Sequence, residues 1–149
     1  MKCPPPESLP FAILILINRL SLGLLFFFAG IRKLLPDEAG QTLWVKLDGF
    51  ASHVASQAPL PLFLGKTYGF ALPFVEIVAG FLVAVGLLGR VGASVIALML
   101  LSFMMALGID FWSPQGSPFD KNVILFTLAL LLVATGSGRL SLGYLIRRH

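Results

Sequence analysis

Four stretches of the chain are almost continuously apolar and reach or approach the length needed to cross a membrane. They cover residues 9–31, 68–88, 91–109 and 122–138. A membrane-spanning helix needs about 20 mainly apolar residues, because each residue adds about 1.5 Å toward a hydrocarbon layer of about 30 Å. Backbone groups in lipid must be hydrogen-bonded within the protein, so helices are expected rather than strands. The pattern predicts an all-α integral membrane protein, a four-helix bundle formed by one domain over residues 1–149.

The long connection between the first two spans has a helical pattern of its own. Four apolar residues recur there at helical spacing: Leu43, Leu47, Phe50 and Val54. Trp44 is the type of side chain that lies at headgroup depth. We therefore expect an amphipathic helix in the membrane interface over about residues 41–56. Residues 58–65 are expected to lead back into the membrane as an extended segment.

Composition supports a membrane protein and excludes several other classes. Apolar residues make up 57% of the 149 residues and charged residues 12%, against about 45–50% and 25% in soluble domains. The net charge is +4, but no basic run suggests a nucleic-acid partner, so the expected surroundings are a lipid bilayer. The one cysteine, Cys3, allows no internal disulfide. The two histidines lie outside the spans, and no metal site is expected.

Lysine and arginine gather at the ends of the predicted spans, as membrane topology requires. The two sides of the membrane carry five such residues each. On one side they lie in shorter segments and include Arg147 and Arg148 at the C-terminus. This density favours a multi-pass protein with both termini in the cytoplasm.

Two charged residues lie deep within the predicted spans, Arg19 in the first and Glu76 in the second. Counted from the ends that the two helices share, Arg19 lies about 15 Å deep and Glu76 about 18 Å deep. Unpaired, each would cost at least about 2.5–3.5 kcal/mol at the bilayer centre. Guanidinium and carboxylate can instead form two parallel hydrogen bonds. We therefore predict an Arg19–Glu76 ion pair.

Small, polar and aromatic residues surround this predicted pair. Gly23, Phe26, Gly30 and Lys33 follow Arg19 on one stripe of the first helix, and Gly80 follows Glu76 by one turn. The candidates for lining a pocket beside the pair are Asn18, Gly23, Phe26, Gly30, Gly80, Ser102, Asn122 and Thr127. Ser102 and Thr127 are expected near the depth of the pair, as parts of a polar layer. The glycines have a second interpretation as packing residues that let helix backbones approach. Four residues are expected at the membrane interface: Lys33, Trp44, Trp112 and Lys121.

Three segments resemble the DoxX family of small bacterial membrane proteins. They are RLSLGLLFFFAGIRK (residues 19–33), EIVAGFLVAVGLLGR (76–90) and KNVILFTLALLLVATGSGRLSLG (121–143). The resemblance implies a four-helix fold in the bacterial cytoplasmic membrane. It also implies kinship with the DoxD-type subunit of thiosulfate:quinone oxidoreductase and with partners of membrane redox complexes. Gly143 stands where family members often have an aspartate, which weakens any role for a carboxylate in the tail.

Three functional hypotheses follow from these residues and the resemblance. In the first, the chain is a membrane subunit of a redox complex that binds a quinone, without a covalent cofactor, beside Arg19 and Glu76. Arg19 would donate to a quinone oxygen, Glu76 would relay protons, and a redox-protein partner would supply electrons. In the second, the chain is a non-catalytic scaffold, alone or as a homo-oligomer, and the ion pair is structural. In the third, it carries protons or a small solute, with Pro73 near Glu76 marking a flexible midpoint.

Overall fold

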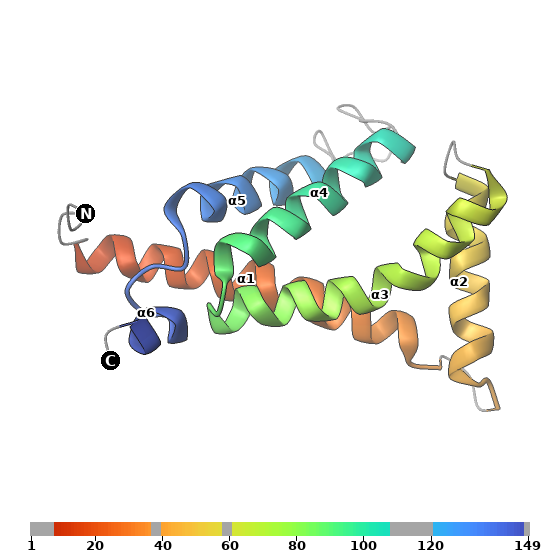
Figure 1. Ribbon diagram of the computed structural model, residues 1–149, viewed down its shortest axis with the longest axis horizontal. Helices are drawn as coiled ribbons and strands as arrows, with labels where there is room; N and C mark the ends of the chain where they lie inside the picture. The colour runs from red at the N-terminus through yellow and green to blue at the C-terminus, as the bar shows by residue number, and fades with distance from the viewer. Residues whose placement is uncertain (1–7, 37–39, 58–60, 108–120, 148–149) are drawn as a thin grey trace.

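The computed structural model describes residues 8–36, 40–57, 61–107 and 121–147 (Figure 1). These residues form six helices and no strand, which confirms the all-α expectation. The helices are α1 (Leu9–Leu34), α2 (Leu43–Gln57), α3 (Leu62–Val85), α4 (Gly89–Leu107), α5 (Lys121–Thr135) and α6 (Leu142–Arg147). By length and composition α1 and α3 can cross a membrane, and α4 and α5 contain shorter apolar helices.

The largest difference from the predicted elements lies at the start of α3. This helix begins at Leu62, directly after Pro61, so the extended return expected over residues 62–65 is wrong. Proline fixes its own backbone and restricts the residue before it, but it does not prevent a helix from starting after it. The helix also continues through Pro73, and Figure 1 shows α3 as a bent helix. Residues 58–60 lie outside the described part of the chain.

The helices α1 and α3 run antiparallel with their backbones in close contact. A Cβ atom added to Gly80 would lie 2.5 Å from the backbone nitrogen of Phe27. On α1, a Cβ atom at Gly23 would lie 2.5 Å from the nitrogen of Ala84, and one at Gly30 would lie 2.6 Å from the carbonyl oxygen of Pro73. The neighbouring helix therefore fills the space beside all three glycines, which act here as packing residues.

The helix α2 lies at the predicted place, but the face that it buries is only partly the predicted one. Its buried residues are Leu47, which was predicted, and Ala51 and Ala55, which were not, whereas Leu43 is exposed. Two glycines of α3 accept this face: a Cβ atom at Gly69 would lie 2.7 Å from the Cα atom of Ala51, and Gly65 is similarly close to Ala55. Small residues at positions i and i+4 on both helices allow this approach. The helix is thus docked onto the first half of α3 (Figure 1).

The helices α4 and α5 complete the core. The helix α4 packs against both α3 and α5. Large apolar side chains that are almost fully buried come from four helices: Leu22, Val83, Ile96, Leu100 and Leu132. Phe50 of α2 packs against the edge of this core.

At its N-terminal end α1 extends past the end of α3. The α3–α4 turn lies level with Arg19, because Gly86 in that turn is in contact with the Arg19 guanidinium. About ten residues of α1 therefore project beyond α3 (Figure 1). The segment after α5 crosses this projecting part, and a Cβ atom at Gly138 would lie 3.1 Å from Cγ2 of Ile15. The chain then ends its described part in α6, a short helix that the apolar pattern did not predict.

Candidate functional site

The two buried charges of the predicted pair do not meet. Arg19 donates from Nη1 to the carbonyl oxygen of Ser137 and from Nη2 to that of Leu140, both at 2.9 Å. Glu76 instead accepts from Lys33. The predicted Arg19–Glu76 pair is therefore wrong. The depth count assumed that α1 and α3 end at the same level, whereas the projection of α1 separates the two residues by about ten positions, roughly 15 Å.

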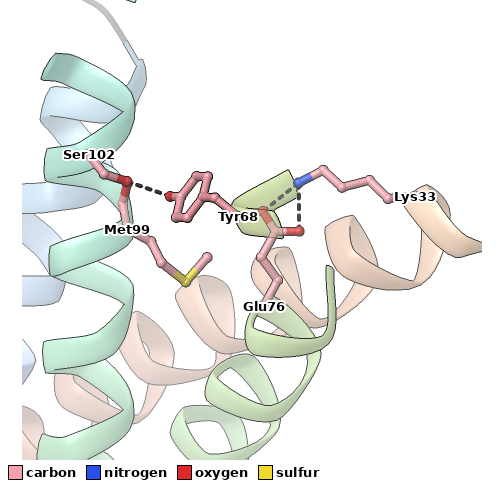
Figure 2. A network of polar contacts seen from close by, with 5 residues as sticks. All are labelled: Lys33, Tyr68, Glu76, Met99 and Ser102. Atoms are coloured by element: carbon pink, nitrogen blue, oxygen red, sulfur yellow. Dashed lines mark hydrogen bonds and ion pairs between the residues drawn. The ribbon is translucent and has the colours of Figure 1, made fainter. Parts of the chain in front are cut away.

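Lys33 and Glu76 form a partly buried ion pair between α1 and α3 (Figure 2). The Lys33 ammonium donates to both carboxylate oxygens of Glu76, at 2.6 Å for Oε2 and in a shorter contact with Oε1. Glu76 is 1% exposed, and the side chain of Lys33 is 25% exposed. Lys33, expected at the membrane interface, is therefore a partner of the buried acid.

The close packing of α1 and α3 explains why these two residues meet. A Cβ atom at Gly30 would lie 3.1 Å from Cβ of Glu76, so the two residues are at the same level. Lys33 follows Gly30 by about one turn on the same face, within reach of the carboxylate. The sequence did carry a signal for this pair: matching Gly23 of α1 with the small residues Gly80 and Ala84 of α3 sets the correct register.

An aromatic side chain from α2 completes the surroundings of the pair. The Lys33 nitrogen lies 5.2 Å from the ring centroid of Phe50, within the range of a cation–π interaction. From the sequence, Phe50 is expected only as part of the apolar face of α2. Its ring now brings a third helix to the Lys33–Glu76 pair.

A second polar contact links α3 to α4 close to the pair (Figure 2). The hydroxyl groups of Tyr68 and Ser102 are 2.5 Å apart, and Ser102 donates to the carbonyl oxygen of Met99 at 2.7 Å. Because the Ser102 proton is directed to Met99, the Tyr68 hydroxyl is the donor in the first contact. Tyr68 was not among the candidate residues. It precedes Glu76 by eight positions, which places both on similar faces of α3.

The remaining pocket candidates are spread over the molecule. Asn18 donates to the carbonyl oxygen of Leu128 at 3.3 Å, and Phe26 lies in the core. Thr127 is exposed and donates to the carbonyl oxygen of Ile124 in its own helix. Of the two residues expected in the polar layer, Ser102 forms a contact with Tyr68, whereas Thr127 bonds within its own helix and forms no part of that contact.

The candidates for the membrane interface have separate locations. Trp44 is 70% exposed near the start of α2. Lys121 is the exposed first residue of α5, and Asn122, a pocket candidate, follows it. Trp112 lies outside the described residues. Of the residues expected at the interface, Lys33 is the one that forms the ion pair with Glu76.

Comparison with known proteins places the chain in a family. The model of the family described as "Methylamine utilisation protein MauE" matches residues 11–135. No curated protein and no solved structure matches the chain. The match extends from α1 to α5 and includes Lys33, Phe50, Tyr68 and Glu76. The chain belongs to the MauE family, a family of membrane proteins. The sequence motifs resembled the DoxX family instead, and the comparison does not confirm that resemblance.

Proposed function

We propose that this MauE-family protein is a membrane subunit of a redox system in methylamine utilisation, and that the Lys33–Glu76 pair is its binding site for a quinone headgroup. The family description supports the process. The observation that carries the proposed site is the burial of Glu76, which is 1% exposed in an apolar helix and is bound by a single lysine. Ionisable groups inside membrane helices are costly and generally mark a ligand or proton pathway.

The side chains around the pair fit the headgroup of a quinone. The Lys33 ammonium has three donors, of which Glu76 takes two, so one remains for a carbonyl oxygen. Lys33 is also the more exposed member of the pair, which allows a ligand to reach it. The Phe50 ring, already close to the Lys33 nitrogen, offers an aromatic surface. A donor, a titratable acid and an aromatic ring are thus present together.

Each residue has a distinct role in this proposal. Lys33 orients the headgroup by donating to an oxygen, and Phe50 packs against the ring. Glu76 holds and releases a proton, since reduction of a quinone by two electrons also consumes two protons. The described residues contain no group of three His, Cys, Asp or Glu side chains that could hold a redox metal. In this proposal a partner protein therefore delivers the electrons.

The depth of Glu76 supports access from the membrane. Glu76 lies about ten residues along α3 from the α3–α4 turn, roughly 15 Å. If that turn lies at one surface, Glu76 is near the middle of a hydrocarbon layer of about 30 Å. Figure 1 shows the start of α1 and the helix α6 toward this same end of the molecule. We propose a bacterial cytoplasmic membrane with this end on the cytoplasmic side.

A structural role for the pair is the second candidate function, that of a scaffold. The observation favouring it is the position of the pair directly beside Gly30, where α1 and α3 are in backbone contact. An ion pair at this point would fix the register of the two helices without binding any ligand. Replacing a buried pair by apolar residues then leaves the protein stable, whereas removing one partner does not.

Quinone binding by the purified full-length chain distinguishes the two candidates. The chain in mild detergent is titrated with a short-chain ubiquinone analogue, and bound analogue is measured by equilibrium dialysis. We expect Phe50→Leu, which retains the ion pair, to weaken binding about fivefold through loss of an aromatic contact of about 1 kcal/mol. Lys33→Met/Glu76→Leu should abolish binding while the protein stays folded. Thr127→Val, on an exposed site, is the matched control with unchanged binding.

Two sets of results would contradict the quinone site or favour the scaffold function. Failure of the wild-type chain to bind the analogue, with no quinone found by mass spectrometry in the purified protein, contradicts the quinone site. If in addition Lys33→Met and Glu76→Gln each destabilise the fold and the double variant restores it, the pair is a structural element and the scaffold function is correct.

A further inference from the structure

The Lys33–Glu76 pair lies near the surface at one end of the molecule only. Lys33 is the last residue but one of α1, which ends at Leu34, and its side chain is 25% exposed. Glu76 is almost fully buried and lies about ten residues from the α3–α4 turn, roughly 15 Å. The helix α2 runs across the end of the molecule where α1 finishes (Figure 1). We call the surface formed by α2 and the end of α1 the α2 side.

Packed apolar residues separate the pair from the opposite end of the molecule. The side chains that fill this region are almost fully buried: Leu22, Phe26, Ala79, Val83 and Ile96. Val83 lies two turns from Glu76 toward the α3–α4 turn, and a Cβ atom at Gly92 of α4 would lie 2.9 Å from its Cγ2 atom. Apolar side chains packed this closely leave no room for a chain of water molecules along which a proton could move.

The hydroxyl groups of Tyr68 and Ser102 do not form a route past this region. Tyr68 interacts electrostatically with Glu76, but its hydroxyl donates to Ser102, which donates to the carbonyl oxygen of Met99. A carbonyl oxygen accepts a hydrogen bond and has no proton to pass on. Tyr68 also precedes Glu76 by eight positions, so it lies on the α2 side of the acid.

We propose that Glu76 exchanges protons with the α2 side of the membrane alone, and that Lys33 carries them. Both carboxylate oxygens of Glu76 accept from the Lys33 ammonium, so this nitrogen is the group through which a proton reaches the acid. An N–H bond of Lys33 breaks as an O–H bond forms on Glu76, and a hydronium ion on the α2 side then returns a proton to Nζ and becomes water.

This inference rests on the proposed function, because the proton that Glu76 holds is one that a bound quinone would consume. It adds a direction to that function. With the α3–α4 turn on the cytoplasmic side, the protons for the quinone come from the opposite side of the membrane. The Phe50 ring of α2, beside the Lys33 nitrogen, then lies next to the path that they take.

Labelling of single cysteines from each side of the membrane tests the proposal without any quinone. All variants carry Cys3→Ser and are treated with a methanethiosulfonate reagent that bears a quaternary ammonium group and does not cross the membrane. Right-side-out and inverted membrane vesicles are compared. Ser56→Cys, on an exposed position of α2, marks the α2 side, and Leu88→Cys, in the α3–α4 turn, marks the opposite side.

The variant Lys33→Cys/Glu76→Gln removes both charges of the pair. We expect its cysteine to be labelled in the vesicles that label Ser56→Cys, and to stay at background in those that label Leu88→Cys. Val83→Cys, a substitution of similar size in the packed apolar region, is the matched control and should stay at background in both kinds of vesicle.

Acetylation of the wild-type chain guards against misfolding of the variants. A sulfonated succinimidyl ester, which also does not cross the membrane, should modify Lys33 only in the vesicles in which it modifies Lys66, whose side chain is 40% exposed. Modification of position 33 from the Leu88 side, or from neither side, would overturn the proposal, as would labelling of Val83→Cys from the Leu88 side. Failure of quinone binding with the expected labelling pattern would reject the proposed quinone site and support one-sided access to Glu76.

Discussion

Gly86 leaves the space that the guanidinium of Arg19 occupies. A Cβ atom at Gly86 would lie 2.5 Å from Nη1 of Arg19 and 2.7 Å from Cβ of Ser141. The same glycine ends α3 with a φ angle of +77°, a conformation that side chains disfavour. One residue thus ends a helix and opens the route by which Arg19 reaches the carbonyl groups of Ser137 and Leu140.

Replacement of Gly86 by alanine should therefore be strongly destabilising. Gly86→Ala forces an alanine into the left-handed backbone conformation and makes its Cβ atom clash with Arg19. We expect a loss of about 2–4 kcal/mol in the free energy of unfolding. Gly49→Ala is the matched control, because Gly49 lies within α2 with open space around it; it should gain about 0.5–1 kcal/mol. Equilibrium unfolding in detergent measures both. If Gly86→Ala lowers the free energy of unfolding no more than a surface substitution does, the contact between Gly86 and Arg19 is refuted.

Loss of the Arg19 side chain should release the C-terminal segment. Arg19→Gln leaves the carbonyl oxygens of Ser137 and Leu140 without their charged donor, at a cost of about 2–4 kcal/mol. Hydrogen exchange should accelerate in residues 137–146 and remain slow in α2. Arg32→Gln, an exposed arginine on the same helix, should change neither. Uniform acceleration over the whole chain would contradict a local role.

The docking of α2 on α3 can be tested at Gly69. Gly69→Leu places a large side chain against Ala51, whose Cα atom would be 2.7 Å from the new Cβ atom, and we expect α2 to separate from α3. Spin labels are attached to cysteines introduced at Ser52 of α2 and Thr67 of α3, in a Cys3→Ser background. The distance between the two labels is then measured with and without Gly69→Leu. Gly49→Leu is the control with an unchanged distance. A helix held only by lipid would give the same distance with and without the Gly69 substitution.

The hydroxyl groups of Tyr68 and Ser102 should be energetically coupled. A double-mutant cycle of Tyr68→Phe and Ser102→Ala isolates their contact at 2.5 Å, and we expect a coupling energy of about 0.6–1.7 kcal/mol, the range found between membrane helices. Tyr68→Phe with Thr127→Val is the control cycle, because Thr127 bonds within its own helix. Additive effects in the first cycle would show that the contact does not form.

The sequence predicted the helices better than the contacts between them. Apolar runs located α1, α4, α5 and the end of α3 within about three residues, because hydropathy and helix length follow from local composition. The start of α3 was missed because Pro61 suggested an extended segment, although proline is compatible with the first turn of a helix. The six-residue helix α6 was missed because so short a helix depends on its packing rather than on its own sequence.

The partner of Glu76 could not be obtained by counting depth along separate helices. The relative level of α1 and α3 depends on which glycine meets which backbone, and this is a property of the packed pair. Arg19 and Glu76 were both correctly recognised as buried charges, yet Lys33 lay closer to Glu76 once Gly30 had set the level. Tyr68 and Phe50 entered the site in the same way, through the bend of α3 and the docking of α2.

The hydrogen bonds of Arg19 join the first helix to the last part of the chain, and this has a consequence for biosynthesis. Its acceptor Ser137 lies 118 residues further along the sequence. At about 5–20 residues per second, a ribosome needs roughly 6–24 seconds to add that many residues. During this interval the Arg19 guanidinium lacks both of its acceptors, although residues that contact it, such as Gly86, have already been translated. The hydrogen bonds that hold Arg19 therefore form only after residues 137–140 have been translated, at least 118 residues after Arg19 itself.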